Sequence, residues 1–205
     1  MSFFRGIFGP SRDEVWKELS EAIGADFVDG GTWHGDKVQA HVKNWTITLD
    51  TYAVSTGKST HVFTRLRAPF CARGDLRFKI YRKGVFSEVG KFLGMMDIEV
   101  GHSVQFDEDF IIQGNDESKV RSVLADEEIR RLLEVQPAVQ LELKDGERLG
   151  LFQRFPEGED ELVFHIHGVF KDVEKLKLLF DLFSALLERL AELGLATEET
   201  PTVRF

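Results

Sequence analysis

Cysteine is almost missing from the chain, and its scarcity excludes several kinds of site. Cys71 is the single cysteine among 205 residues. A disulfide within the chain and a zinc site built from several thiolates are therefore both excluded. Since a chain with one thiol suits a reducing compartment, we expect a cytoplasmic protein. No cofactor motif is present, and we expect no cofactor.

Long apolar runs are missing as well. No stretch of about 18 consecutive apolar residues occurs, so we expect no transmembrane helix and a soluble protein. The segment MSFFRGIFGP carries Phe3, Phe4, Ile7 and Phe8 but lacks the continuous apolar region and cleavage site of a signal peptide. We expect this arm to pack on its own domain. The alternative is docking onto a second copy or a membrane surface.

Positive charge is the minority charge. Lys and Arg number 26 against 35 Asp and Glu, which gives a formal net charge of −9. Because affinity for phosphate backbones depends on Lys and Arg, we do not expect nucleic acid as a partner. The chain also lacks G-x-S-x-G, P-loop and G-x-G-x-x-G motifs, so no catalytic residue is predicted and enzyme activity has no support.

The periodicity that is present predicts an α+β fold. Ser11 to Glu14 reads S-x-x-E, a capping box that starts a helix ending near Gly24. Alternation from residue 38 to residue 80 predicts four antiparallel strands in a meander. A helix from Val173 to about Leu193 has a wide apolar stripe. We expect it to cover one sheet face and to bury Phe180, Phe183 and Leu187.

The same patterns suggest how the chain is divided. We expect one domain over residues 1–194, with a possible boundary between two lobes near 95–105, and a flexible tail over 195–205. Smaller expected elements are a short helix from Val85 to Leu93 and a hairpin turn at Asp145-Gly146.

The densest cluster of carboxylates lies in FDEDFIIQGNDESKVRSVLADEEIRRLL, residues 106–133. Asn115 and Asp126 are placed to cap two short helices, with acidic residues in the first turns that follow. Asp107 and Asp109 remain, before a short strand, and D-x-D spacing can bind a hard cation. A solvated position at the start of the strand is the favoured interpretation.

Two further groups of residues are candidates for binding. His165 and His167 lie two apart on a predicted strand and so share a face, as metal-binding pairs do, and His41 and His61 on other predicted strands could approach them. The favoured interpretation is a His pair that faces solvent. Four cations would line one face if their two strands pair, and they would suit an anionic partner. These are Arg65, Arg67, Arg77 and Lys79. The favoured interpretation is that they pair with the acidic helices of the same molecule.

Several segments carry a resemblance to known sequences, among them NWTITLDTY, TRLRAPF, GKFLGMMDIEVG and VFKDVEKLKLLFDLF. They resemble a group of uncharacterised bacterial proteins of about this length. The F-D-x-x-F and R-x-L-L segments resemble, more distantly, a bacterial domain family of unknown function whose members are often membrane-attached. The resemblance implies a bacterial cytosolic protein and no residue roles.

Together these observations favour a noncatalytic interaction or ligand-binding module. Its partner would be a second copy of the chain or an anionic molecule at the basic strands. The alternative is a metal-dependent enzyme or metal-binding protein that uses His165 and His167, or Asp107 and Asp109.

Overall fold

The structure is a computed structural model that describes residues 10–31, 35–84, 95–145 and 155–205. Three predicted features lie wholly or partly outside the described residues. They are the N-terminal arm, the helix from Val85 to Leu93 and the turn at Asp145-Gly146.

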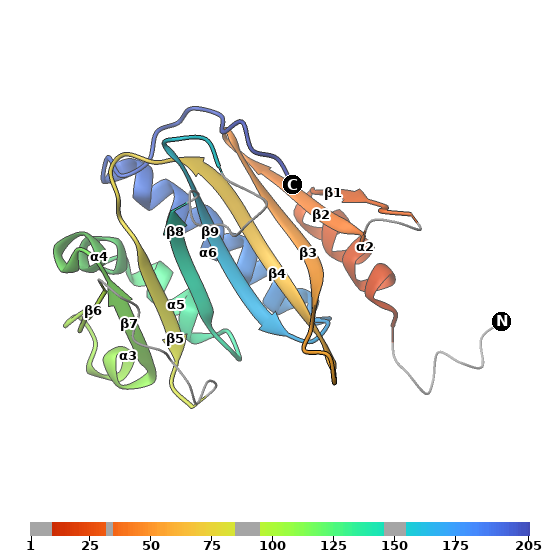
Figure 1. Cartoon of the computed structure of the whole chain (residues 1–205), viewed down its shortest axis with the longest axis horizontal. Coiled ribbons are helices and arrows are strands. Elements are labelled where there is room, and N and C mark those ends of the chain that lie inside the picture. Colours follow the sequence, from red (N-terminus) through yellow and green to blue (C-terminus); the bar gives the residue numbers. More distant parts are fainter. Residues whose placement is uncertain (1–9, 32–34, 85–94, 146–154) are drawn as a thin grey trace.

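One antiparallel sheet organises the described chain (Figure 1). Its nine strands are ordered β1-β2-β3-β4-β9-β8-β5-β7-β6. The strands are β1 (Asp26–Val28), β2 (Lys37–Val42), β3 (Trp45–Ser55), β4 (Thr60–Cys71), β5 (Phe78–Arg82), β6 (Met96–Asp97), β7 (Phe110–Gly114), β8 (Gln140–Asp145) and β9 (Glu159–His167). The helices are α2 (Arg12–Ile23), α3 (Val104–Asp109), α4 (Glu117–Leu124), α5 (Glu127–Glu134) and α6 (Val173–Glu192). The predicted α+β class is confirmed.

The long helix α6 lies across one face of the sheet, with α2 and α5 beside it (Figure 1). Phe183 and Leu187 are fully buried and Phe180 is 4% exposed, as the apolar stripe predicted. The strands supply the other half of this core through alternate residues such as Ile47 and Leu66. The core therefore lies between the sheet and the helices.

The predicted four-strand meander is wrong in its last step. β2, β3 and β4 are neighbours, but β4 pairs next with β9, and β5 lies beyond β8. The β9 ladder runs along β4 from Thr64 to Cys71, a longer edge than the short β5 could fill. After Cys71 the chain leaves the ladder of β4 and β9, and the Arg73 amide donates to the Leu195 carbonyl. Long-range pairing therefore overrides the simplest local connection.

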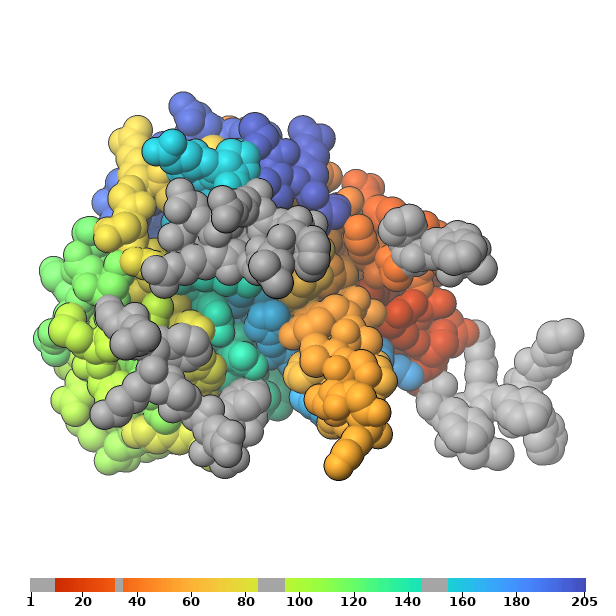
Figure 2. Space-filling view, in the orientation of Figure 1, coloured from red at the N-terminus to blue at the C-terminus, as the bar shows by residue number. Residues whose placement is uncertain are grey.

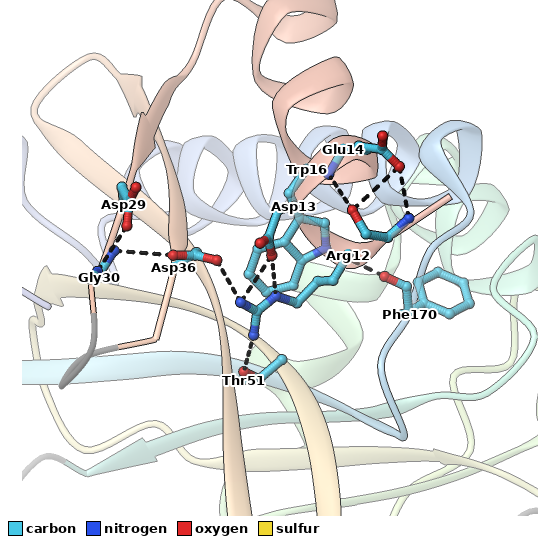
Figure 3. A network of polar contacts seen from close by, with 11 residues as sticks. Arg12, Asp13, Glu14, Trp16, Asp29, Gly30, Asp36, Thr51 and Phe170 are labelled. Carbon is cyan, nitrogen blue, oxygen red and sulfur yellow. Dashed lines mark hydrogen bonds and ion pairs between the residues drawn. The ribbon is translucent and has the colours of Figure 1, made fainter. Parts of the chain in front are cut away.

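The start of α2 is fixed by polar contacts (Figure 3). Ser11 and Glu14 form the predicted capping box. Arg12 pairs with Asp36 and donates to Thr51 Oγ1 at 3.4 Å, which ties the helix to the segment before β2 and to β3. Burial by itself would raise the pKa of Asp36, but hydrogen bonds, first from the Gly30 amide and also from Arg12, lower it. These groups join structural elements to one another.

The acidic stretch mainly starts helices. Asp126 caps α5 by accepting from the amides of Glu128 and Ile129, as predicted. The cap of α4 is Asp116 rather than Asn115. The Asn115 side chain instead accepts from the Arg77 amide and donates to the Asp75 carbonyl, so it joins the chain before β5 to the end of β7.

The last eleven residues contact the sheet, which differs from the flexible tail expected from sequence. The Thr197 amide donates to the Cys71 carbonyl at 2.8 Å. Glu159 accepts from the amides of Thr202 and Val203 at 2.7 and 3.1 Å. Gln39 Nε2 donates to the Phe205 carbonyl at 2.9 Å. Residues 195–205 thus run from the end of β4 back to β2.

Strands from before and after residues 95–105 belong to the same sheet. Within the described ranges, no helix combines the length and the apolar character needed to cross a bilayer.

Candidate functional site

The sheet face opposite α6 carries most of the groups that were singled out in the sequence. We call it the polar face. Register and strand alternation place the following side chains there: Thr48, Asp50, Tyr52, Phe63, Arg65, Arg67, Lys79, Glu142, Lys144, Glu161 and His165. Figure 1 views the molecule from this side, with the strands in front of α6.

Asp50 of β3 is the centre of one ion-pair cluster on the polar face. It is 5% exposed and accepts from Arg65 Nε at 2.9 Å and from Arg67 Nη2 at 2.7 Å. The Arg67 guanidinium also lies 3.5 Å from the centre of the Phe205 ring. Burial lowers the pKa of Arg67, and the Asp50 charge opposes that effect. Both arginines therefore share one carboxylate, which balances one of their two positive charges.

The other two predicted cations lie apart from the first two. Lys79 of β5 pairs with Glu142 of β8 at 3.2 Å, and Lys79 is 9% exposed. Arg77 precedes β5, beside Asp75 and Asn115. Because β9 and β8 separate β4 from β5, the four cations do not lie on two directly paired strands, as the sequence hypothesis required. Arg65, Arg67 and Lys79 each already contact a carboxylate of the same molecule.

His165 lies near the middle of the polar face and is engaged with Tyr52. The Tyr52 hydroxyl is 3.0 Å from His165 Nδ1. Burial, with smaller contributions from Lys144 and Arg65, lowers the pKa of His165 to about 3. Burial also raises the pKa of Tyr52. His165 is therefore a neutral, weakly basic ring at neutral pH, which does not suit a general base.

A row of rings leads from His165 to the exposed end of β4 and β9. Tyr52 stacks on Phe63 at 5.3 Å between ring centres, and Phe63 meets the His167 ring edge-on at 5.2 Å. The His167 ring is in turn 5.8 Å from the His61 ring. The structure thus brings His167 close to His61.

The other metal candidates are occupied by protein groups. Both oxygens of Asp107 accept backbone amides, from Val100 and Gly101, at 2.8 Å. Asp109 accepts from Gln105 Nε2 at 3.0 Å, and both acids lie on the short helix α3, which directly precedes β7. His41 is elsewhere, near Thr46 and Asp26. Among the described residues, no group of three or more His, Cys, Asp and Glu side chains could hold a metal ion.

One end of β3 and β4 stands beyond the neighbouring strands. We call residues 51–64 the projecting hairpin. β2 pairs with β3 only as far as Leu49, and β9 pairs with β4 only from Thr64 onward. Residues 53–62 are all exposed, and Val54 and Val62 are 44% and 38% exposed. Figure 2 shows the tip of this hairpin, in orange, at the lower edge of the molecule.

A hollow of about 500 Å³ lies beside β6, β7 and α4. Its charged lining is already used: Asp107 holds two amides, and Glu117 pairs with Arg121 at 2.8 Å. A smaller hollow of about 210 Å³ lies between the hairpin of β2 and β3 and residues 200–204. Neither hollow gathers the residues that the sequence singled out.

Sequence reasoning did not identify the projecting hairpin. A signal was available, because no Asp or Glu occurs from Thr51 to Gly74 in a chain of net charge −9. The lengths of β3 and β4, however, became informative only once their shorter neighbours were known.

The fold defines an α+β protein with a helix-covered antiparallel sheet. No protein-family model matches the chain, and no curated protein matches it. Among solved structures, the chain is similar to the crystal structure of the mycobacterial trehalose monomycolate transport factor A, TtfA. The TM-score is 0.51 at 7% identity, over 94% of this chain and 98% of that chain. At this identity the likeness concerns the fold alone.

Proposed function

We propose that the chain is a noncatalytic interaction module that binds a protein partner through the projecting hairpin. The observation that carries this proposal is the run of ten exposed residues, 53–62, on a hairpin that extends beyond both neighbouring strands. Two neighbouring strands are usually joined by a short connection close to the sheet. In this hairpin the ladder between β3 and β4 instead continues into solvent before the chain turns. A partner would cover what is now exposed.

The chemistry of the hairpin suits a protein surface. Val54 and Val62 are two of the large apolar side chains that are exposed, and Phe63 is half-buried at the base. Lys58 is the only Lys, Arg, Asp or Glu between residues 51 and 64. Depletion of charge with an aromatic anchor is typical of the central part of protein interfaces. In an acidic chain, this element can approach another acidic surface without strong repulsion.

The polar face gives the hairpin a rigid base. Asp50, bound by Arg65 and Arg67, links β3 and β4 directly below the hairpin, and Arg65 lies over the Tyr52 ring at 5.0 Å. A one-residue slip between the two strands would place Asp50 on the opposite face from both arginines. The buried charges therefore support one register, which fixes the position of the hairpin.

Site-specific photocrosslinking in the native host tests this proposal. Benzoylphenylalanine would replace Val54, and in a matched variant it would replace Met96, which is 54% exposed on β6 at the opposite edge of the sheet. We expect a discrete crosslinked species from position 54 and none from position 96. Val62→Glu, with its folding checked by thermal unfolding, should remove the species.

The mass of the crosslinked species distinguishes between partners. Twice the mass of the chain identifies a second copy, and any other discrete mass identifies a different protein. Equal crosslinking from both positions, or none from position 54, contradicts the proposal. A cytoplasmic location is part of the proposal and is supported by the single cysteine.

A further inference from the structure

We propose that His61 and His167 form a two-histidine site for a divalent transition metal ion, chiefly Zn²⁺. The sequence suggested His165 as the companion of His167, but the ladder of β4 and β9 brings His61 to it instead. This site is independent of whether the projecting hairpin binds a partner.

The separation of the two rings suits one shared ion. Their centres are 5.8 Å apart and the ring planes are inclined by 53°. Metal–nitrogen bonds of about 2.0–2.1 Å place two imidazole centres about 5 to 6 Å apart when both bind the same ion. Both side chains are exposed, so an ion can reach them and small side-chain rotations can complete the geometry.

The surrounding backbone holds the two strands together at this point. The Gly168 amide donates to the Val62 carbonyl at 2.7 Å, and Gly168 forms a bridge with Phe63. Phe63 also supports the His167 ring through its edge-on contact. The residues that follow each ligand are thus joined, which lowers the entropy lost when an ion binds.

The contact of His61 with Ser59 supplies an orienting hydrogen bond. His61 Nε2 is 2.9 Å from Ser59 Oγ. With the proton on Nε2, Ser59 Oγ accepts a hydrogen bond from it and His61 Nδ1 is left to bind the ion. Histidines that bind metal ions commonly donate their other ring N–H to a neighbouring group in this way. His165 suits an ion less well, because it is less exposed than His61 and His167 and because three cations, Lys144, Arg65 and Lys79, lie near it.

Imidazole ligands select the class of ion. They suit Zn²⁺, Cu²⁺ and Ni²⁺, whereas Mg²⁺ and Ca²⁺ prefer oxygen. Two protein ligands leave coordination positions open for water or for a group from another molecule. The site is therefore an accessible one, unlike a closed structural zinc centre.

Calorimetric titration of the tag-free protein with ZnCl₂, and separately with MgCl₂, tests the inference. We expect one Zn²⁺ per chain and no Mg²⁺ binding. His61→Ala and His167→Ala should each weaken Zn²⁺ binding by about tenfold or more, since each removes one of two ligands. His41→Ala, an exposed histidine on β2, is the matched control and should stay within about twofold of the unmodified protein.

His167→Gln repeats the test with a neutral side chain of similar size, and unchanged thermal unfolding shows that each variant is folded. Unchanged Zn²⁺ binding in His61→Ala or His167→Ala overturns the proposal. So does an equal loss in His41→Ala, or the failure of the unmodified protein to bind Zn²⁺ at millimolar concentration.

Discussion

The two faces of the sheet use the same strands but are stabilised by different physics. The helix-covered face buries apolar side chains such as Leu49, Leu66 and Phe164 against α6. The polar face also buries much of its surface, but there the buried groups are charges, such as Asp50 and Glu161, each with a partner. Hydrophobic burial is nondirectional, whereas an ion pair requires one geometry.

The two faces therefore contribute to the fold in different ways. Apolar packing supplies most of the favourable free energy, because each large side chain contributes about 1.5–3 kcal/mol when it is fully buried. Buried charges contribute little net stability, since their desolvation offsets their attraction. What they add is discrimination against wrong registers, because an unpaired buried charge is strongly unfavourable.

The largest expected effect is on the helix-covered face. Phe183→Ala should lower the free energy of unfolding by about 3–5 kcal/mol, since it leaves a cavity between α6 and the sheet. Reversible urea unfolding measures the loss. Glu188→Ala, at a half-exposed position on the same helix, is the control and should change stability by about 0.5 kcal/mol or less. A loss below about 1 kcal/mol for Phe183→Ala would contradict the role assigned to this face.

Breaking the Asp50 cluster should cost nearly as much. Asp50→Asn keeps the size of the side chain but removes the carboxylate that Arg65 and Arg67 share. It should lower the free energy of unfolding by about 3 kcal/mol. Glu117→Gln removes a half-exposed partner of Arg121 and should change stability by about 0.5 kcal/mol or less. Urea unfolding of both variants compares the two environments. Equal losses would mean that burial of the Asp50 cluster has no special consequence.

His165 gives the polar face a pH dependence that the apolar face lacks. The unfolded chain protonates this ring below about pH 6.5, whereas burial keeps the folded pKa at about 3. Stability should therefore fall as pH falls between these values and be unaffected above them. Between pH 7.5 and pH 5.5, the free energy of unfolding of His165→Gln should fall by about 1 kcal/mol less than that of the unmodified protein. The same replacement at exposed His41 is the control, and identical pH profiles for all three proteins would refute the assignment.

The smallest effect on stability is expected at the projecting hairpin. Val54→Lys should change the free energy of unfolding by about 0.5 kcal/mol or less, because Val54 is 44% exposed. In a protein that carries benzoylphenylalanine at position 62 instead of position 54, Val54→Lys should also remove the crosslinked species. A stability loss comparable to that of Phe183→Ala would show that the hairpin is part of the core.

Local sequence signals located individual elements well. The capping box at Ser11, the Asp126 cap and the apolar stripe of α6 were all found, because each depends on residues within a few positions of one another. Asn115 was assigned the wrong role. Asn and Asp are both good caps, and only the contacts of Asn115 with Asp75 and Arg77 decide that Asp116 caps α4.

The candidate sites were harder to predict, since they depend on which strands become neighbours. The sequence placed Arg65 beside Arg67, and His165 beside His167, on single strand faces, which follows from the period of two. It could not place Arg65 opposite Asp50, or His61 near His167, because those contacts follow from the registers of β3 with β4 and β4 with β9.

The sequence by itself determined the elements, the amphipathic helix that covers the sheet and the exclusion of a disulfide, because composition and short-range periodicity encode them. Only the tertiary structure decided that β9 rather than β5 lies beside β4. That choice places Lys79 beside Glu142 of β8 rather than beside Arg65 and Arg67, brings His167 near His61 and leaves the end of the β3 and β4 hairpin without a neighbouring strand. The physical reason is that strand pairing depends on how well two strands match along their facing edges. This match is a property of two segments that are distant in sequence, so neither segment reveals it alone.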